Sequence, residues 1–249
     1  MQLSISRSLG AVALCSMASF AYANTTHDAF VDPADSVSFD GFNTLSSSRI
    51  TAANLVSGIT SNVAGSGDAT FTRTSGAHYP ATGGLYSFSG PSTFEVADST
   101  VTANVDSVVF QSFVNISNGA DGVWGLLSPQ NLPTLSYNGG NQSLAATTQF
   151  TEPVPYLDST FTPVPADPDN PNYARFTWDL SGVGAPITSY TIDFGLDAHS
   201  QALAFQVNQV VAVPEPEAFA MMALGMGVIG FVARRRRESG SASGQAATA

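Results

Sequence analysis

Oxygen-bearing side chains gather in one proline-rich stretch of the sequence. Asp167 and Asp169 flank Pro168, and Asn170 follows directly. Calcium binds six to eight oxygen atoms, often from carboxylates and carbonyls, so Asp167, Asp169 and Asn170 are candidate calcium ligands. Asp, Asn and Pro also favour turns, so the same residues fit a turn without a metal. A second acidic group has the same two interpretations: Asp28, Asp32 and Asp35.

The sequence holds no recognisable catalytic constellation. Its three histidines, His27, His78 and His199, are far apart and lack the spacing of metal ligands. Its one cysteine, Cys15, lies in the N-terminal apolar stretch, so the rest of the chain has neither a disulfide nor a thiol nucleophile. Signature motifs of serine hydrolases, zinc proteases and phosphate-binding loops do not occur. We therefore expect no catalytic residues and no cofactor, with calcium as the one candidate ion. A secreted hydrolase is the least favoured alternative.

Exposed aromatic side chains could bind sugars. Tyr173 borders the proline-rich stretch, which predicts an exposed ring, and Trp124 is the second candidate for a glycan contact. Val123 and Leu126 beside Trp124 also fit a tryptophan in the core. Trp178 shares a strand face with apolar neighbours, so we expect it in the core.

The middle of the chain is acidic. Charged residues make up 11% of the 249, no lysine occurs, and four of the eight arginines form one run near the C-terminus. Between Asn24 and Val213, sixteen acidic residues stand against three arginines. Such a surface repels phosphates, so we expect no nucleic acid partner. Hydrophobic residues make up 43% of the chain, which is enough for a packed core.

The N-terminus has the pattern of a secretory signal peptide. Arg7 supplies the positive charge, and residues 9–21 form a short apolar stretch. Ala21 and Ala23 flank Tyr22 in an A-x-A cleavage site. We therefore predict a signal peptide at residues 1–23 and a mature body that begins at Asn24.

The C-terminus has three consecutive parts before its last residues. The stretch Val213, Pro214, Glu215 and Pro216 is stiff and extended, because proline fixes φ and disfavours helix in the residue before it. Residues 218–233 carry no charge. As a transmembrane helix they would be about 24 Å long, slightly less than a usual span. The positive-inside rule places the next four residues in the cytoplasm as a stop-transfer signal: Arg234, Arg235, Arg236 and Arg237. We expect the polar tail, residues 238–249, to be disordered.

This order of features resembles the PEP-CTERM family of sorted proteins over residues 213–237. The same segment resembles a motif catalogued at the C-terminus of ice-binding proteins, but the body has no extended threonine array that would support ice binding. The resemblance implies an exosortase as partner, a membrane enzyme that cleaves near Pro-Glu-Pro, and a Gram-negative source that makes exopolysaccharide or biofilm. The tail after Arg237 is longer than the family usually shows. A plain membrane anchor without processing is the alternative.

The body, residues 24–212, shows the alternation of antiparallel strands. One apolar face and one solvent-facing polar face are predicted for residues 175–180, 189–194 and 203–208. Residues 138–141, Asn-Gly-Gly-Asn, predict a hairpin loop, since Gly and Asn tolerate positive φ. Residues 47–56 give a weak helix signal, and residues 57–90, rich in Gly, Ser and Thr, favour long loops. The pattern predicts an all-β fold, a jelly-roll-like antiparallel β-sandwich in one domain.

Together these features predict an exported protein. We expect it to be anchored transiently in the inner membrane and then to reach the cell surface or the extracellular space. The favoured function is that of a non-enzymatic surface or extracellular-matrix protein associated with exopolysaccharide in a biofilm. The alternative is a lectin-like carbohydrate-binding module, which calcium could assist.

Overall fold

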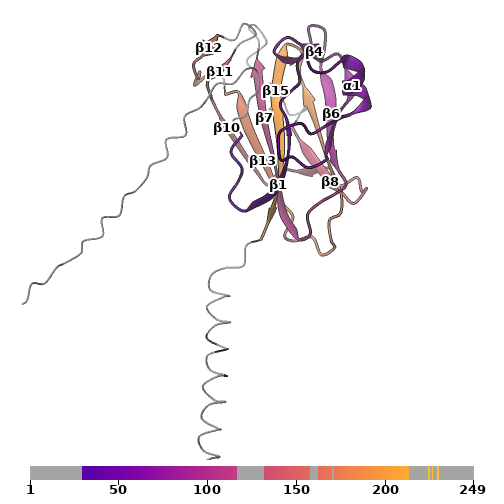
Figure 1. Ribbon diagram of the computed structural model, residues 1–249, viewed down its shortest axis with the longest axis vertical. Helices are drawn as coiled ribbons and strands as arrows, with labels where there is room; N and C mark the ends of the chain where they lie inside the picture. The colour runs from indigo at the N-terminus through magenta and orange to yellow at the C-terminus, as the bar shows by residue number, and fades with distance from the viewer. Residues whose placement is uncertain are drawn as a thin grey trace, which may run out of the picture.

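The described part of the chain forms a sandwich of two antiparallel sheets (Figure 1). The computed structural model describes residues 30–116, 132–157, 162–169 and 171–212, and the single positions Leu224, Met226 and Ile229. Every strand pairing within these ranges is antiparallel. The expected all-β antiparallel sandwich is therefore confirmed.

The larger sheet is built around β15, which pairs with β7 along its whole length. On its other side β15 pairs first with β5 and then with β1. Within the described residues this sheet has seven strands: β10 (Thr148–Glu152), β13 (Tyr173–Asp179), β7 (Val105–Ile116), β15 (Ser200–Val211), β5 (Gly84–Tyr86) and β4 (Tyr79–Ala81) in that order, with β1 (Ser36–Phe42) beside β15.

The smaller sheet packs on the inward face of the larger one. Its six strands among the described residues are, in order, β2 (Ile59–Thr60), β3 (Thr70–Gly76), β6 (Ser92–Asp98), β14 (Tyr190–Leu196), β8 (Thr134–Tyr137) and β9 (Leu144–Ala145). A separate pair consists of β11 (Tyr156–Leu157) and β12 (Pro163–Val164). The one described helix of several residues is α1 (Ala52–Ser57), in which Thr51 and Asn54 form a capping box.

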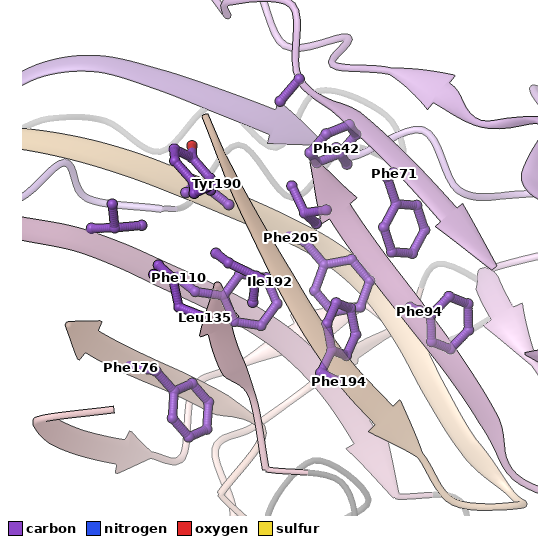
Figure 2. Packing of buried hydrophobic residues seen from close by; sticks show 14 of the residues in the cluster. Phe42, Phe71, Phe94, Phe110, Leu135, Phe176, Tyr190, Ile192, Phe194 and Phe205 are labelled. Atoms are coloured by element: carbon purple, nitrogen blue, oxygen red, sulfur yellow. The ribbon is translucent and has the colours of Figure 1, made fainter. Parts of the chain in front are cut away.

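Aromatic rings from both sheets fill the core (Figure 2). The ring centroid of Phe205 on β15 lies 5.2 Å from that of Phe71 on β3 and 5.1 Å from that of Phe194 on β14. Phe110 of β7 lies 5.0 Å from Phe194. Each ring buried in this way stabilises the fold by roughly 1.5–3 kcal/mol. Trp178 is also buried, as expected, and its Nε1 donates to the Leu144 carbonyl at 2.9 Å.

Part of the outward face of the larger sheet is covered, contrary to the expectation that the polar residues of 203–208 in β15 meet water. Gln206 and Asn208 are 5% and 0% exposed. Asp32, in the segment before β1, accepts hydrogen bonds from Gln206 Nε2 at 2.8 Å and from Asn208 Nδ2 at 2.7 Å. A register shift also moves Leu203 out of the main core into a cluster under Phe30. The N-terminal segment of the body therefore covers this face around Leu203, Gln206 and Asn208.

Several other local predictions are confirmed, and the one for residues 57–90 is wrong. Residues 175–179 lie in β13 and residues 190–194 in β14, and the alternating apolar side chains of both predicted segments are buried. The Asn-Gly-Gly-Asn loop joins β8 to β9, and Asn138 and Gly139 have φ of 52° and 67°. Residues 57–90 are not long loops, because they contain β2, β3, β4 and β5. Short pairings of two or three residues leave too little alternation to detect in a Gly- and Ser-rich stretch.

The structure does not test the predictions made for the two ends of the chain. The signal peptide at 1–23, the sorting motif at 213–216, the arginines at 234–237 and the tail at 238–249 lie outside the described ranges. Within those ranges no helix is long and apolar enough to cross a membrane.

Candidate functional site

Two tyrosines lie side by side on the outward face of the larger sheet, on the β4–β5 hairpin. Tyr79 is directly opposite Tyr86, and Tyr86 is opposite Gln201 of β15. Directly paired residues place their side chains on the same face of a sheet. The alternate residues Pro80 and Leu85 are buried, so both tyrosines point away from the core. Tyr79 is 38% exposed.

Phe88 extends this row at the turn after β5, and 68% of its surface is exposed. Its ring meets that of Tyr86 nearly edge-on, with centroids 4.6 Å apart and an interplanar angle of 72°. The buried Ser87 builds the turn: its Oγ donates to the Gly90 carbonyl at 2.7 Å and accepts from the backbone N–H groups of Ser89 and Gly90. The turn is thus fixed from the inside, while Phe88 projects outward.

His199, just before β15, ties the turn to the sheet. Its backbone N–H donates to the Ser87 carbonyl at 2.8 Å, and its Nδ1 lies 3.0 Å from the Tyr86 hydroxyl oxygen. Its ring centroid lies 6.4 Å from that of Phe88. The φ of His199 is 65°, a left-handed conformation that is uncommon outside glycine. We call Tyr79, Tyr86, Phe88 and His199 the aromatic patch.

The aromatic patch offers both apolar ring faces and hydrogen-bonding atoms. Well-packed hydrogen bonds hold the backbone under Phe88, so little freedom is lost when a ligand contacts the ring. Strained backbone of the kind seen at His199 clusters at ligand-binding sites. The patch is therefore suited to stack on an apolar ligand face and to hydrogen-bond polar groups around that face.

A second feature is a hollow of about 470 Å³ on the outward side of the smaller sheet, lined in part by Thr70, Glu95 and Asp98. Glu95 is directly opposite Asp193 on β14. Burial raises the pKa of both carboxyl groups, and the nearby Asp193 charge raises the pKa of Glu95 further. Among the described residues, no group of three or more His, Cys, Asp or Glu side chains could hold a metal ion.

Two of the candidate calcium ligands, Asp167 and Asp169, lie at a turn. The backbone N–H of Asp169 donates to Asp167 Oδ1 at 3.0 Å, so the Asp167 side chain stabilises its own backbone. Asn170 and Asp28 are outside the described residues. Asp32 bonds the buried amides of β15, and Asp35 occupies a turn with φ of 68°. Asp167, Asp32 and Asp35 therefore have turn or packing roles in the described structure.

Tyr173 is not exposed as expected. Only 8% of its surface is accessible, because Phe30 and Phe113 cover its ring. Its hydroxyl donates to Gln111 Oε1 at 2.6 Å, and burial raises its pKa. The sequence next to Tyr173 suggested a surface loop, but β13 begins at this residue. Trp124, the other candidate glycan contact, lies outside the described residues.

A histidine and two serines meet inside the protein. His78 Nδ1 lies 2.8 Å from Ser92 Oγ, and its Nε2 lies 3.3 Å from Ser200 Oγ. All three residues are buried, and His78 is 0% exposed. Burial lowers the pKa of His78 to about 4. A catalytic histidine must reach substrate, so this arrangement serves packing and hydrogen bonding.

Sequence reasoning missed the aromatic patch. Its residues come from β4, β5 and the turns after β5 and before β15. They meet only because β5 pairs with β15 across more than a hundred residues of chain. One local signal was available: Tyr86 and Phe88 are large rings in a stretch otherwise rich in Gly, Ser and Thr.

The β-sandwich fold does not by itself identify a function. A family model, the PEP-CTERM protein-sorting motif, matches residues 212–237. The match confirms the resemblance seen at this end of the sequence and indicates an exported protein that is targeted to an exosortase. Comparison with curated protein sequences and with solved structures found no match.

Proposed function

We propose that this protein is a non-enzymatic surface or extracellular-matrix component that an exosortase sorts and that associates with exopolysaccharide in a biofilm. The observation that carries the proposal is the match of residues 212–237 to the sorting motif. In this proposal the apolar stretch at 218–233 and the four arginines after it hold the chain transiently in the inner membrane. Cleavage near Pro214-Glu215-Pro216 then frees residues 24–212 for the cell surface.

The order of the strands supports a jelly-roll scaffold. Four neighbouring strands of the larger sheet follow the order β1, β15, β7, β13. Four neighbouring strands of the smaller sheet follow the order β6, β14, β8, β9. The chain crosses between sheets at each step from β6 to β7 and from β7 to β8. Two interleaved Greek keys of this kind define a jelly roll, a fold that occurs in lectin domains among others. This likeness concerns the fold alone and does not identify a ligand.

The aromatic patch favours a lectin-like module as the second candidate function. Phe88 and Tyr79 are exposed rings at the end of a well-packed scaffold. The two candidates differ in specificity: a matrix protein binds many polysaccharides weakly, and a lectin binds one glycan class. A glycan array with and without EDTA distinguishes them, and it also tests whether calcium takes part.

The sorting proposal is tested by replacing Pro214, Glu215 and Pro216 with alanine in the producing cells. We expect the variant to stay in the inner-membrane fraction at its unprocessed size, while the native protein reaches the surface or the medium. A matched control replaces Ser239, Gly240 and Ser241, which lie beyond the matched motif, and should be sorted normally. Normal processing and release of the Pro-Glu-Pro variant would contradict the proposal.

A further inference from the structure

We infer that the aromatic patch binds an uncharged pyranose unit of a polysaccharide by stacking the sugar ring on Phe88. This inference rests on the proposed association with polysaccharide and names the site and the ligand class. Its basis is the placement of one largely exposed ring, Phe88, beside two groups that can hydrogen-bond, the Tyr86 hydroxyl and the His199 imidazole, whose Nδ1 lies 3.0 Å from that hydroxyl oxygen.

Phe88 is displayed by the backbone around it. The side chain of Ser87 is buried and closes the turn by three hydrogen bonds. The turn is joined to the segment before β15 through the His199 N–H. The protein thus builds an ordered turn under a side chain that gains little from folding, since most of its apolar surface stays in water. A ligand with an apolar face would remove that surface from water.

A pyranose ring has such a face. The axial C–H groups of many hexoses form an apolar surface about as wide as a phenyl ring, and hydroxyl groups surround it. The exposed ring of Phe88 can cover the C–H surface. Tyr86, His199 and the partly exposed Gln201 beside Tyr86 can exchange hydrogen bonds with the surrounding hydroxyls. The patch therefore combines the two kinds of contact that a sugar ring needs.

The size of the patch favours a sugar over a protein partner. A stable interface between proteins buries about 800 Å² on each side and uses roughly 20–30 residues of each. The aromatic patch has four side chains, of which Tyr79, Phe88 and His199 are exposed and Tyr86 is half-buried. Its area fits one or two sugar rings and is too small for a second copy of the chain.

The charge of the protein favours an uncharged sugar. The chain has a net charge of −11, and between Asn24 and Val213 acidic residues outnumber arginines by sixteen to three. Asp197 lies two residues before His199. A polymer of uronic acids would meet repulsion on approach, whereas a neutral glucan or mannan would not. The expected ligand is therefore a neutral hexose polymer.

The inference is tested by affinity electrophoresis of the full-length protein in gels that contain laminarin, galactomannan, dextran or alginate. A zwitterionic detergent keeps the chain soluble and adds no sugar headgroup. We expect at least one neutral polymer to retard the protein and alginate to leave it unretarded. Phe88→Ala should weaken binding roughly tenfold, and Phe88→Trp should keep it, because a larger ring preserves stacking.

A matched control is Phe150→Ala. Phe150 lies on the outward face of the same sheet, is 45% exposed, and contacts the Arg175 guanidinium instead of the patch. Its removal should leave binding unchanged. If Phe88→Ala binds as well as the native protein, the site is wrong and the proposed association stands. If no polysaccharide retards the native protein, both the site and the association are wrong. Equal binding to alginate would contradict the uncharged ligand class.

Discussion

The imidazole Nδ1 of His78 lies 2.8 Å from the Ser92 hydroxyl oxygen, deep between the two sheets. Burial lowers the pKa of His78 from 6.5 to about 4. As the pH falls below 6.5, His78 therefore binds a proton in the unfolded chain but not in the folded chain, and the free energy of unfolding declines until about pH 4. The loss attributable to His78 is about 3 kcal/mol over this window.

Urea unfolding at pH 7.5, 5.5 and 4.5 measures this loss. His78→Gln serves as the comparison, because glutamine cannot titrate. The raised pKa values of Asp40, Glu95 and Asp193 act in the opposite direction, since the folded state then binds protons more readily as pH falls. The difference between the two proteins isolates His78. Parallel pH profiles would show that His78 does not titrate as described.

The buried carboxylate of Asp40 should weaken the fold at neutral pH. Burial raises its pKa, and the nearby Asp98 charge raises it further. Asp40 Oδ1 accepts a hydrogen bond from the Ala69 N–H at 3.0 Å, a bond that an amide oxygen can replace. We expect Asp40→Asn to raise the melting temperature at pH 7.5, and the gain to shrink at pH 4 as Asp40 itself becomes neutral. A gain that is the same at both pH values would exclude this electrostatic cause.

Phe205 joins the two sheets. Its ring contacts Phe71 and Phe194 of the smaller sheet and Phe110 of its own. Phe205→Ala should cost about 3–5 kcal/mol of unfolding free energy, because a cavity remains where the ring packed. The exposed Phe150 is the control, and its replacement by alanine should cost much less. Equal losses for the two variants in urea titrations would argue against the sandwich core.

Asp32 holds the N-terminal segment on the larger sheet. Its Oδ1 accepts hydrogen bonds from Gln206 and Asn208, both buried. Asp32→Ala should cost about 1–3 kcal/mol, because two buried amide groups lose a shared acceptor. Asp32→Asn keeps an oxygen at this position and should recover part of the loss. Hydrogen exchange of residues 30–36 reports the effect directly, and unchanged protection in Asp32→Ala would refute it.

The sequence predicted those parts of the fold that depend on local alternation. Residues 175–179 and 190–194 lie in strands with buried apolar faces, and Trp178 is in the core. Burial that depends on distant segments could not be predicted in this way. Tyr173 and Asn208 are hidden because Phe30 and Asp32 cross the outward face of the sheet. Local patterns contain no information about such a cover.

The sorting motif and the aromatic patch also differ in whether they depend on distant segments of the chain. The sorting motif is a continuous segment, so its order of prolines, apolar residues and arginines was visible in the sequence and the family model matches it. The aromatic patch is discontinuous. Tyr86 and His199 become neighbours only through the pairing of β5 with β15, and a periodicity of two does not predict which strands pair.

The central claim is that the C-terminal motif directs export and processing, and the mass of the mature protein tests it most directly. The protein recovered from the cell surface or the medium should be measured intact, and its last peptide identified by mass spectrometry. Processing predicts that the mature chain ends near Pro214-Glu215-Pro216 and lacks Arg234 to Arg237. A surface protein that still ends at Ala249 would contradict the claim.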